Sequence, residues 1–319
     1  MTTSAITATG LRKSYDDNLV LDGVDLDIAT GTVFSLLGVN GSGKTTIVRI
    51  LSTLIPDDGG QASVGGYDVA ADAADVRSLI GVTGQFSAVD RLLTGRENLM
   101  LMADLRHLGR PAGERRVGEL LERFELADRA DQPLATYSGG MVRRLDLAMT
   151  LVGDPRIIFL DEPTTGLDPR SRLTMWQIIR ELVADGVTIF MTTQYLEEAD
   201  RLSDRVGLLE GGRIVAEGTP LELKRRTPGG HLILRFTVER ELTAASTILG
   251  DVIPDVEALT LHVPTDGSVQ ALRSVLGRLE SEAVDVDSLE IHATDLDDVF
   301  LSLTGGPAAE SLPERASRS

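Results

Sequence analysis

Residues 38–46 constrain the fold of this chain more than any other segment, because they fit G-x-x-x-x-G-K-T, the pattern of a phosphate-binding loop. A short apolar run at 33–37 precedes the loop and predicts a buried strand, and a helical pattern begins at Thr46. Glycines let backbone N–H groups converge on phosphate oxygens, and the start of a helix adds partial positive charge there. The sequence therefore predicts an α/β fold with a nucleotide site.

The residues of this loop have distinct predicted roles. Lys44 supplies a positive charge for the β- and γ-phosphates, and the Thr45 hydroxyl is a ligand for Mg²⁺. The other residues predicted to cradle the nucleotide are Gly38, Asn40, Gly41, Ser42, Gly43 and Thr46.

A second apolar run, at 156–160, ends in Asp161 and Glu162. The carboxyl ends of parallel strands are where α/β proteins place ligand-binding groups. We expect Asp161 to hold Mg²⁺, directly or through water, and Glu162 to orient or deprotonate the attacking water. Two acids before a proline also suit a simple turn, and the phosphate loop upstream favours the catalytic interpretation.

Ser138, Gly139 and Gly140 precede an amphipathic helix predicted over 141–152. A serine cap followed by two glycines leaves a bare helix N-terminus, which is a second anion site. One chain rarely needs two such sites for one nucleotide. In a head-to-tail dimer, each subunit's turn can close on the γ-phosphate that its partner holds, so the motif predicts a homodimer.

In this order, the motifs resemble those of the ATPase subunits of ABC transporters, over roughly residues 5–225. The resemblance implies that the ligands are ATP and Mg²⁺. It also implies that Gln85 contacts Mg²⁺ and relays to a membrane partner, and that Asp168 lies at the dimer seam. Tyr15 resembles the aromatic residue that stacks on adenine, although an ordinary strand tyrosine would look the same.

One position departs from the family pattern. After a predicted strand at 187–191, the family usually has a histidine that contacts the γ-phosphate, and this chain has Gln194. Glutamine donates and accepts hydrogen bonds but carries no proton at neutral pH. Together with residues 137–141, the segment 192–200 resembles the daunorubicin-resistance type of bacterial drug-export ATPases. The resemblance implies export of a drug, antibiotic or lipid-like compound through a separate transmembrane permease.

The predicted fold class is α/β: a P-loop ABC ATPase cassette at 5–225, with an antiparallel β subdomain and an inserted helical subdomain at about 86–136. A change of pattern after it predicts a small C-terminal α+β domain at 229–304. The polar, proline-containing residues 306–319 are expected to be a disordered tail.

Composition narrows the function classes. The chain of 319 residues has no cysteine, and no apolar run reaches the ~18 residues that a membrane span needs. A net charge of -18 disfavours binding to nucleic acid. We therefore expect peripheral attachment at the cytoplasmic face of the cell membrane. Two alternatives stay open: a soluble ABC ATPase outside transport, and a nucleotide-sensing module without catalysis.

Overall fold

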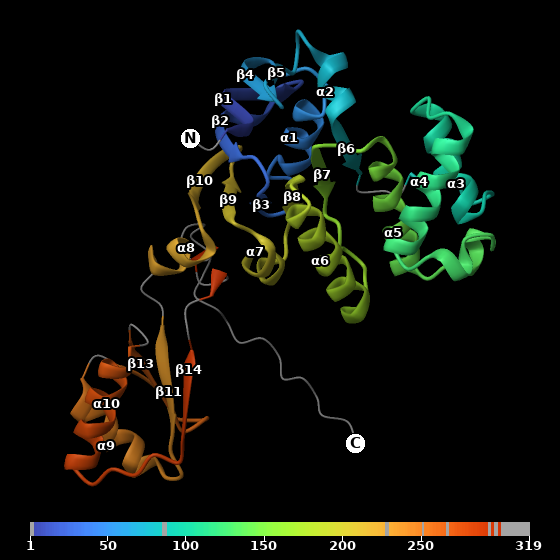
Figure 1. Ribbon diagram of the computed structural model, residues 1–319. Helices are drawn as coiled ribbons and strands as arrows, with labels where there is room; N and C mark the ends of the chain where they lie inside the picture. Colours follow the sequence, from blue (N-terminus) through green and yellow to red (C-terminus); the bar gives the residue numbers. More distant parts are fainter. Residues whose placement is uncertain are drawn as a thin grey trace. The chain divides into compact units, whose positions relative to one another are not determined.

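The computed structural model describes residues 3–84, 88–226, 230–250, 252–265, 268–292, 295–296 and 299–300. Gln85 and the predicted tail at 306–319 lie outside these ranges. The chain divides into two compact units, Met1–Pro220 and Leu221–Ser319 (Figure 1).

A six-stranded, mostly parallel sheet forms the centre of the first unit. Its strands follow the order β10 (Arg213–Gly218), β9 (Arg205–Glu210), β3 (Val33–Leu37), β8 (Thr188–Thr193), β7 (Ile157–Asp161) and β6 (Ile80–Thr83). β3, β7 and β8 are buried along their whole length, as parallel strands covered on both faces must be. β9 and β10 pair antiparallel.

An antiparallel sheet of four strands makes up the rest of the N-terminal part. Its strands follow the order β2 (Asn18–Ala29), β1 (Ser4–Tyr15), β4 (Gly59–Val64) and β5 (Tyr67–Asp68). Apolar residues of this sheet share one core with helix α1 (Lys44–Leu51) and with β3. A short helix, α2 (Ala73–Leu79), leads into β6. The core joins this antiparallel layer to the phosphate loop.

Helices α3 (Gly95–Leu105) and α4 (Arg110–Arg123) form the predicted helical insertion, beside α5 (Gly139–Thr150) (Figure 1). The Thr94 side chain and Glu97 make a capping box that fixes the start of α3. Short 3₁₀ turns follow at Ala127–Arg129, Leu134–Thr136 and Leu151–Gly153. The apolar faces of these helices share a core with α6 (Pro169–Ala184), and α7 (Leu196–Leu202) follows β8.

The second unit is an α+β fold, as the sequence predicts. It opens with α8 (Pro220–Arg226), and its antiparallel sheet has the order β12 (Ile253–Asp255), β13 (Thr260–Pro264), β11 (His231–Arg235) and β14 (Ser288–His292). Helices α9 (Glu239–Leu249) and α10 (Val269–Ser281) cover one face of that sheet (Figure 1). The second unit has its own apolar core, which contains Leu232, Leu234 and Leu261 of the sheet and Leu242 and Leu279 of the helices.

Truncation after Arg226 is expected to leave a folded chain that binds ATP as the full chain does. The phosphate loop, Asp161 and Glu162 all lie in the first unit, and each unit has its own apolar core. Thermal unfolding and titration with a fluorescent ATP analogue would measure this. Loss of binding in a truncated chain that still unfolds cooperatively would show that the second unit completes the nucleotide site.

Candidate nucleotide site

Three predicted site segments meet at one edge of the central sheet. In the parallel register, Leu37 of β3 lies opposite Thr193 of β8, and Thr192 lies opposite Asp161 of β7. The next residues along these strands are Gly38, Gln194 and Glu162, which therefore leave the sheet side by side. This edge, at the carboxyl ends of parallel strands, is where open α/β sheets bind ligands.

The backbone of the phosphate loop admits only glycine at key points. A Cβ on Gly38 would lie 2.5 Å from the Leu209 carbonyl oxygen, and Gly43 has a φ of +108°, which side chains disfavour. Lys44 Nζ lies inside the loop and donates to the carbonyl oxygens of Gly38 at 2.7 Å and Val39 at 3.0 Å. The Ser42 hydroxyl oxygen is buried and has no hydrogen-bond partner among the described residues. An unpartnered hydroxyl here suits a phosphate oxygen.

Two of the three predicted Mg²⁺ ligands, Thr45 and Asp161, are in contact. Thr45 Oγ1 donates to Asp161 Oδ2 at 2.9 Å, and the Asp161 carboxylate is buried. Thr192 Oγ1 holds the other carboxylate oxygen, Oδ1, at 2.5 Å. A hydroxyl and an oriented carboxylate at one point fit a hard cation that prefers oxygen ligands.

Glu162, the predicted general base, has an unusual backbone. Its φ of 50° is left-handed, which costs a non-glycine residue conformational energy. Its N–H donates to the Thr192 carbonyl and hydroxyl oxygens, both at 3.1 Å. Its carboxylate lies 4.0 Å from Lys44 Nζ and accepts from Thr165 Oγ1 at 3.2 Å.

The charges at this edge influence one another. Burial lowers the pKa of Lys44, and the carboxylates of Glu162 and Asp161 oppose that shift. The Glu162 side chain is only one-tenth exposed, and that of Lys44 less. The site thus combines one cation and two acids at the position predicted for the γ-phosphate.

The serine-glycine turn lies beside the predicted dimer-seam aspartate. Ser138 caps α5, where its Oγ accepts from the Met141 N–H at 3.3 Å, and Ser138 and Gly139 are exposed. A Cβ on Gly140 would lie 2.3 Å from Ser171 Oγ, which itself donates to Asp168. Asp168 in turn caps α6 through the N–H groups of Arg170 and Ser171. Among the described residues, Ser138 makes no hydrogen bond to the phosphate loop.

The predicted roles of Tyr15, Gln194 and Gln85 stay predictions. Tyr15 ends β1, is 42% exposed, and has the Lys13 ammonium 5.8 Å from its ring centre. Gln194 is half-buried directly after β8. Gln85 follows β6 by two residues and lies outside the described residues.

Sequence reasoning missed several buried polar residues around the site. Besides Thr192, they include Glu198, whose carboxylate accepts from Thr164 Oγ1 at 2.8 Å and from Trp176 Nε1 at 3.0 Å. Burial raises the pKa of Glu198. The others are Arg143 and Asp146 of α5. Their sequence positions give no signal, because an acid or arginine on a helix is usually solvated.

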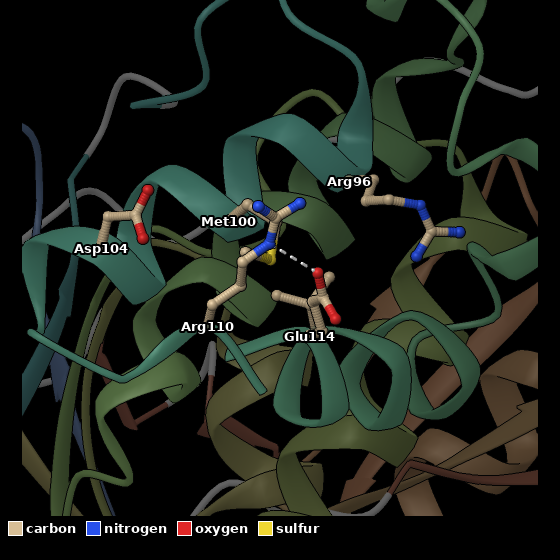
Figure 2. Close-up of a pocket in the computed structure, with 6 residues that line it drawn as sticks. Arg96, Met100, Asp104, Arg110 and Glu114 are labelled. Atoms are coloured by element: carbon tan, nitrogen blue, oxygen red, sulfur yellow. Dashed lines mark hydrogen bonds and ion pairs between the residues drawn. The ribbon is translucent and has the colours of Figure 1, made fainter. Parts of the chain in front are cut away.

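A hollow of about 640 Å³ lies elsewhere, between α3 and α4 (Figure 2). Arg110 and Glu114 form an ion pair at 3.0 Å on its wall, and both side chains are largely exposed. The hollow is lined by Arg96, Met100, Asp104, Arg110, Glu114 and Val117. None of these is a predicted nucleotide ligand, so the hollow is distinct from the nucleotide site.

Comparisons with known proteins agree with this geometry. The ABC transporter family model matches residues 21–165. The daunorubicin resistance ATP-binding protein DrrA3 of Streptomyces coeruleorubidus is 46% identical, over 96% of this chain and 97% of that protein. The daunorubicin/doxorubicin resistance ATP-binding protein DrrA of Streptomyces peucetius is 43% identical, over 98% and 96%.

Solved structures match about two thirds of the chain or slightly more. An ATP-binding subunit of an ABC transporter has a TM-score of 0.63 at 28% identity, covering 70% of this chain and 93% of that one. A dimeric post-hydrolysis state of the cassette MJ0796, bound to ADP and Pi, has a TM-score of 0.61 at 26% identity, covering 67% and 98%. The fold is that of an ABC-type ATPase. The chain belongs to the ABC transporter family, among ATP-binding subunits of the daunorubicin-resistance type.

Proposed function

We propose that this ATPase powers the export of a drug, antibiotic or lipid-like compound through a separate transmembrane permease. The observation that carries the ATPase part is the meeting of Lys44, the Thr45–Asp161 pair and Glu162 at one sheet edge. The export part is supported by relatives named for resistance to daunorubicin and doxorubicin. No helix in the described part of the chain is long and apolar enough to cross a bilayer. We place the subunit at the cytoplasmic face of the membrane, bound to its permease.

The proposed chemistry is hydrolysis of the bond between the β- and γ-phosphates. The loop N–H groups and Lys44 hold the phosphates. Thr45 and Asp161 would hold Mg²⁺, which would supply positive charge to offset that of the phosphates. Glu162 accepts a proton from the attacking water, whose oxygen bonds to the γ-phosphorus as the β-phosphate oxygen leaves. The products are ADP and inorganic phosphate.

We propose that a second copy of the chain completes this site. The exposed Ser138 and Gly139 begin helix α5, and a bare helix N-terminus attracts anions. Among the described residues, Ser138 shares no hydrogen bond with the phosphate loop of its own chain. Its ligand is therefore the γ-phosphate in the partner's loop, with Asp168 beside the seam.

Coexpression with a candidate transmembrane permease would test the export proposal. Inverted vesicles holding both proteins are expected to accumulate daunorubicin or a related amphipathic compound when ATP is supplied. ADP in place of ATP, and a Lys44→Ala chain, serve as controls. ATP hydrolysis without copurification of any membrane protein would favour the soluble, non-transport alternative.

Gln194→Ala is expected to lower ATP turnover by about ten- to a hundredfold while nucleotide binding is retained. A hydrogen bond from the amide to a charged phosphate contributes about 1.5–3 kcal/mol, which corresponds to that rate factor. Because glutamine does not titrate, the wild-type pH–rate profile should show no histidine-like step from this position between about pH 6 and 7. Phosphate release across pH for wild type, Gln194→Ala and Gln194→His measures both effects.

Gln177→Ala is the matched control, because Gln177 is an exposed glutamine of α6 that pairs only with Glu181 among the described residues. It is expected to hydrolyse ATP as the wild type does. If Gln194→Ala also does so, then Gln194 is not part of the catalytic site.

A further inference from the structure

Arg143 of α5 makes an unusual set of contacts for a helical arginine. Its side chain is only 12% exposed. Its guanidinium donates to four backbone carbonyl oxygens: Pro163 at 2.9 Å, Asp161 at 3.0 Å, Gly84 at 3.0 Å and Glu162 at 3.2 Å. Three of these carbonyls are consecutive and lie where β7 delivers the predicted Mg²⁺ ligand and the predicted base.

Asp146, one turn further along α5, holds Arg143 in place. Its carboxylate is 3% exposed, and Oδ2 accepts from Arg143 Nη1 at 3.1 Å. The other oxygen, Oδ1, accepts from the N–H of Ala88 at 2.9 Å. The ion pair therefore also holds Gly84 and Ala88, the described residues on either side of 85–87.

Withdrawing an arginine side chain from water costs free energy unless its donors are paired, and in the largely covered Arg143 all the N–H donors of the guanidinium are used. Burial lowers the pKa of Arg143, and the carboxylates of Asp146 and Asp161 oppose that shift. Arginine's planar guanidinium can satisfy several fixed acceptors at once, whereas a lysine ammonium is a point charge with three donors. The site thus requires the shape of the guanidinium as well as its charge.

The backbone conformation of Glu162 explains why these hydrogen bonds from Arg143 are needed. Its left-handed conformation is unfavourable and persists only where the surroundings fix it. Thr192 holds the N–H side of this residue, while Arg143 at 3.2 Å and the Thr165 N–H at 3.3 Å hold its carbonyl oxygen. Arg143 is the only one of the three that comes from the helix capped by Ser138.

We propose that Arg143, held by Asp146, is a positioning residue for ATP hydrolysis: it fixes the Glu162 peptide so that the carboxylate meets the attacking water. The same contacts connect Glu162 to α5. The start of α5 binds the γ-phosphate in the partner's loop, so that phosphate is mechanically linked to the base at the end of this chain's β7. This inference rests on the proposed role of Glu162 as general base.

Arg143→Lys tests the proposal in the full chain. Because lysine keeps the charge and loses the fork, kcat for phosphate release is expected to fall by about ten- to a hundredfold, the usual cost of a misplaced catalytic group. KM and the Kd for a fluorescent ATP analogue should change by less than about twofold, because Arg143 does not touch the phosphate loop. Asp146→Asn, which is nearly isosteric, should give a smaller fall of the same kind.

The matched control is Arg144→Lys on the same helix. The Arg144 side chain is 17% exposed, and it donates to the Phe124 carbonyl oxygen and the Glu125 carboxylate, not to β7. Its kcat is expected to stay within about twofold of wild type, since among the described residues its side chain bonds only to Phe124 and Glu125. Thermal unfolding of all variants shows which of them are folded.

The double variant of Arg143→Lys and Glu162→Gln distinguishes a positioning role of Arg143 from general damage to the site. If Arg143 acts through Glu162, Arg143→Lys should lower the residual rate of Glu162→Gln by less than about twofold, because there is no base left to misplace. A further fall as large as that in the wild-type background would overturn the proposal, as would wild-type kcat in both Arg143→Lys and Asp146→Asn. Wild-type turnover by Glu162→Gln alone would instead refute the role of Glu162.

Discussion

Glu162→Gln is expected to lower ATP turnover by about 10²–10⁴-fold, the usual contribution of a general base. The amide keeps the size of the carboxyl but takes no proton from water. Nucleotide binding should persist, because Lys44 and the loop backbone hold the phosphates and Glu162 only approaches Lys44, at 4.0 Å. Phosphate release and titration with a fluorescent ATP analogue measure the two effects separately.

Glu114→Gln is a suitable control, since Glu114 is an exposed residue of α4 that pairs with Arg110. It is expected to hydrolyse ATP at the wild-type rate. Glu162→Gln turnover within about twofold of that rate would remove Glu162 from the catalytic site, because a base contributes far more.

Ser138→Arg is expected to lower turnover by at least about 100-fold, the scale of losing one donor to a developing charge. The arginine both fills the space in front of the α5 N-terminus and places its own charge in the anion site. ATP affinity of the monomer should barely change, because Ser138 makes no hydrogen bond to the phosphate loop among the described residues. Equilibrium binding below the dimerisation concentration, beside steady-state phosphate release, measures both quantities.

Ser78→Arg, at an exposed serine of α2, controls for the added charge and bulk. Its turnover and ATP affinity should match the wild type. A collapse of monomer affinity in Ser138→Arg would show that the serine serves the nucleotide of its own chain, and the shared-site proposal would be wrong.

The central sheet and its strand ends could be predicted because their signals are local. Buried strands appear as continuous apolar runs. The phosphate loop begins directly after β3, and Asp161 and Glu162 lie at the end of β7. The helices predicted to begin at Thr46 and at 141 each begin two residues earlier, as α1 and α5. α5 begins at Gly139 rather than 141 because the Ser138 cap draws both glycines into the first turn.

Other features of the fold could not be predicted in this way. Sequence analysis identified neither α9 nor β12 and β13 of the second unit. α9 contains three β-branched residues, namely two threonines and one isoleucine, and one serine among its eleven residues. β12 has only three residues, too few for a periodic pattern.

The supporting residues of the site depend on contacts between distant segments. Arg143 meets carbonyls about 20 residues away on β7 and about 60 away beside β6. Every residue has the same backbone carbonyl group, so the sequence does not show which arginine binds such carbonyls and does not distinguish Arg143 from its neighbour Arg144. Thr192 and Glu198 were missed for the same reason: each is recognisable only once β7, β8 and α6 are packed together.

In the proposed dimer, two copies of this chain enclose ATP, and each completes the site of the other. Light scattering on the Glu162→Gln chain, with Mg²⁺ and either ATP or ADP, tests it most directly, because the variant binds ATP without consuming it. For Glu162→Gln, we predict twice the molar mass of one chain in ATP and the mass of one chain in ADP. For the double variant with Ser138→Arg, we predict the mass of one chain in either nucleotide. A single-chain mass for Glu162→Gln at saturating ATP, or a dimer that forms equally well with Ser138→Arg, would contradict the claim.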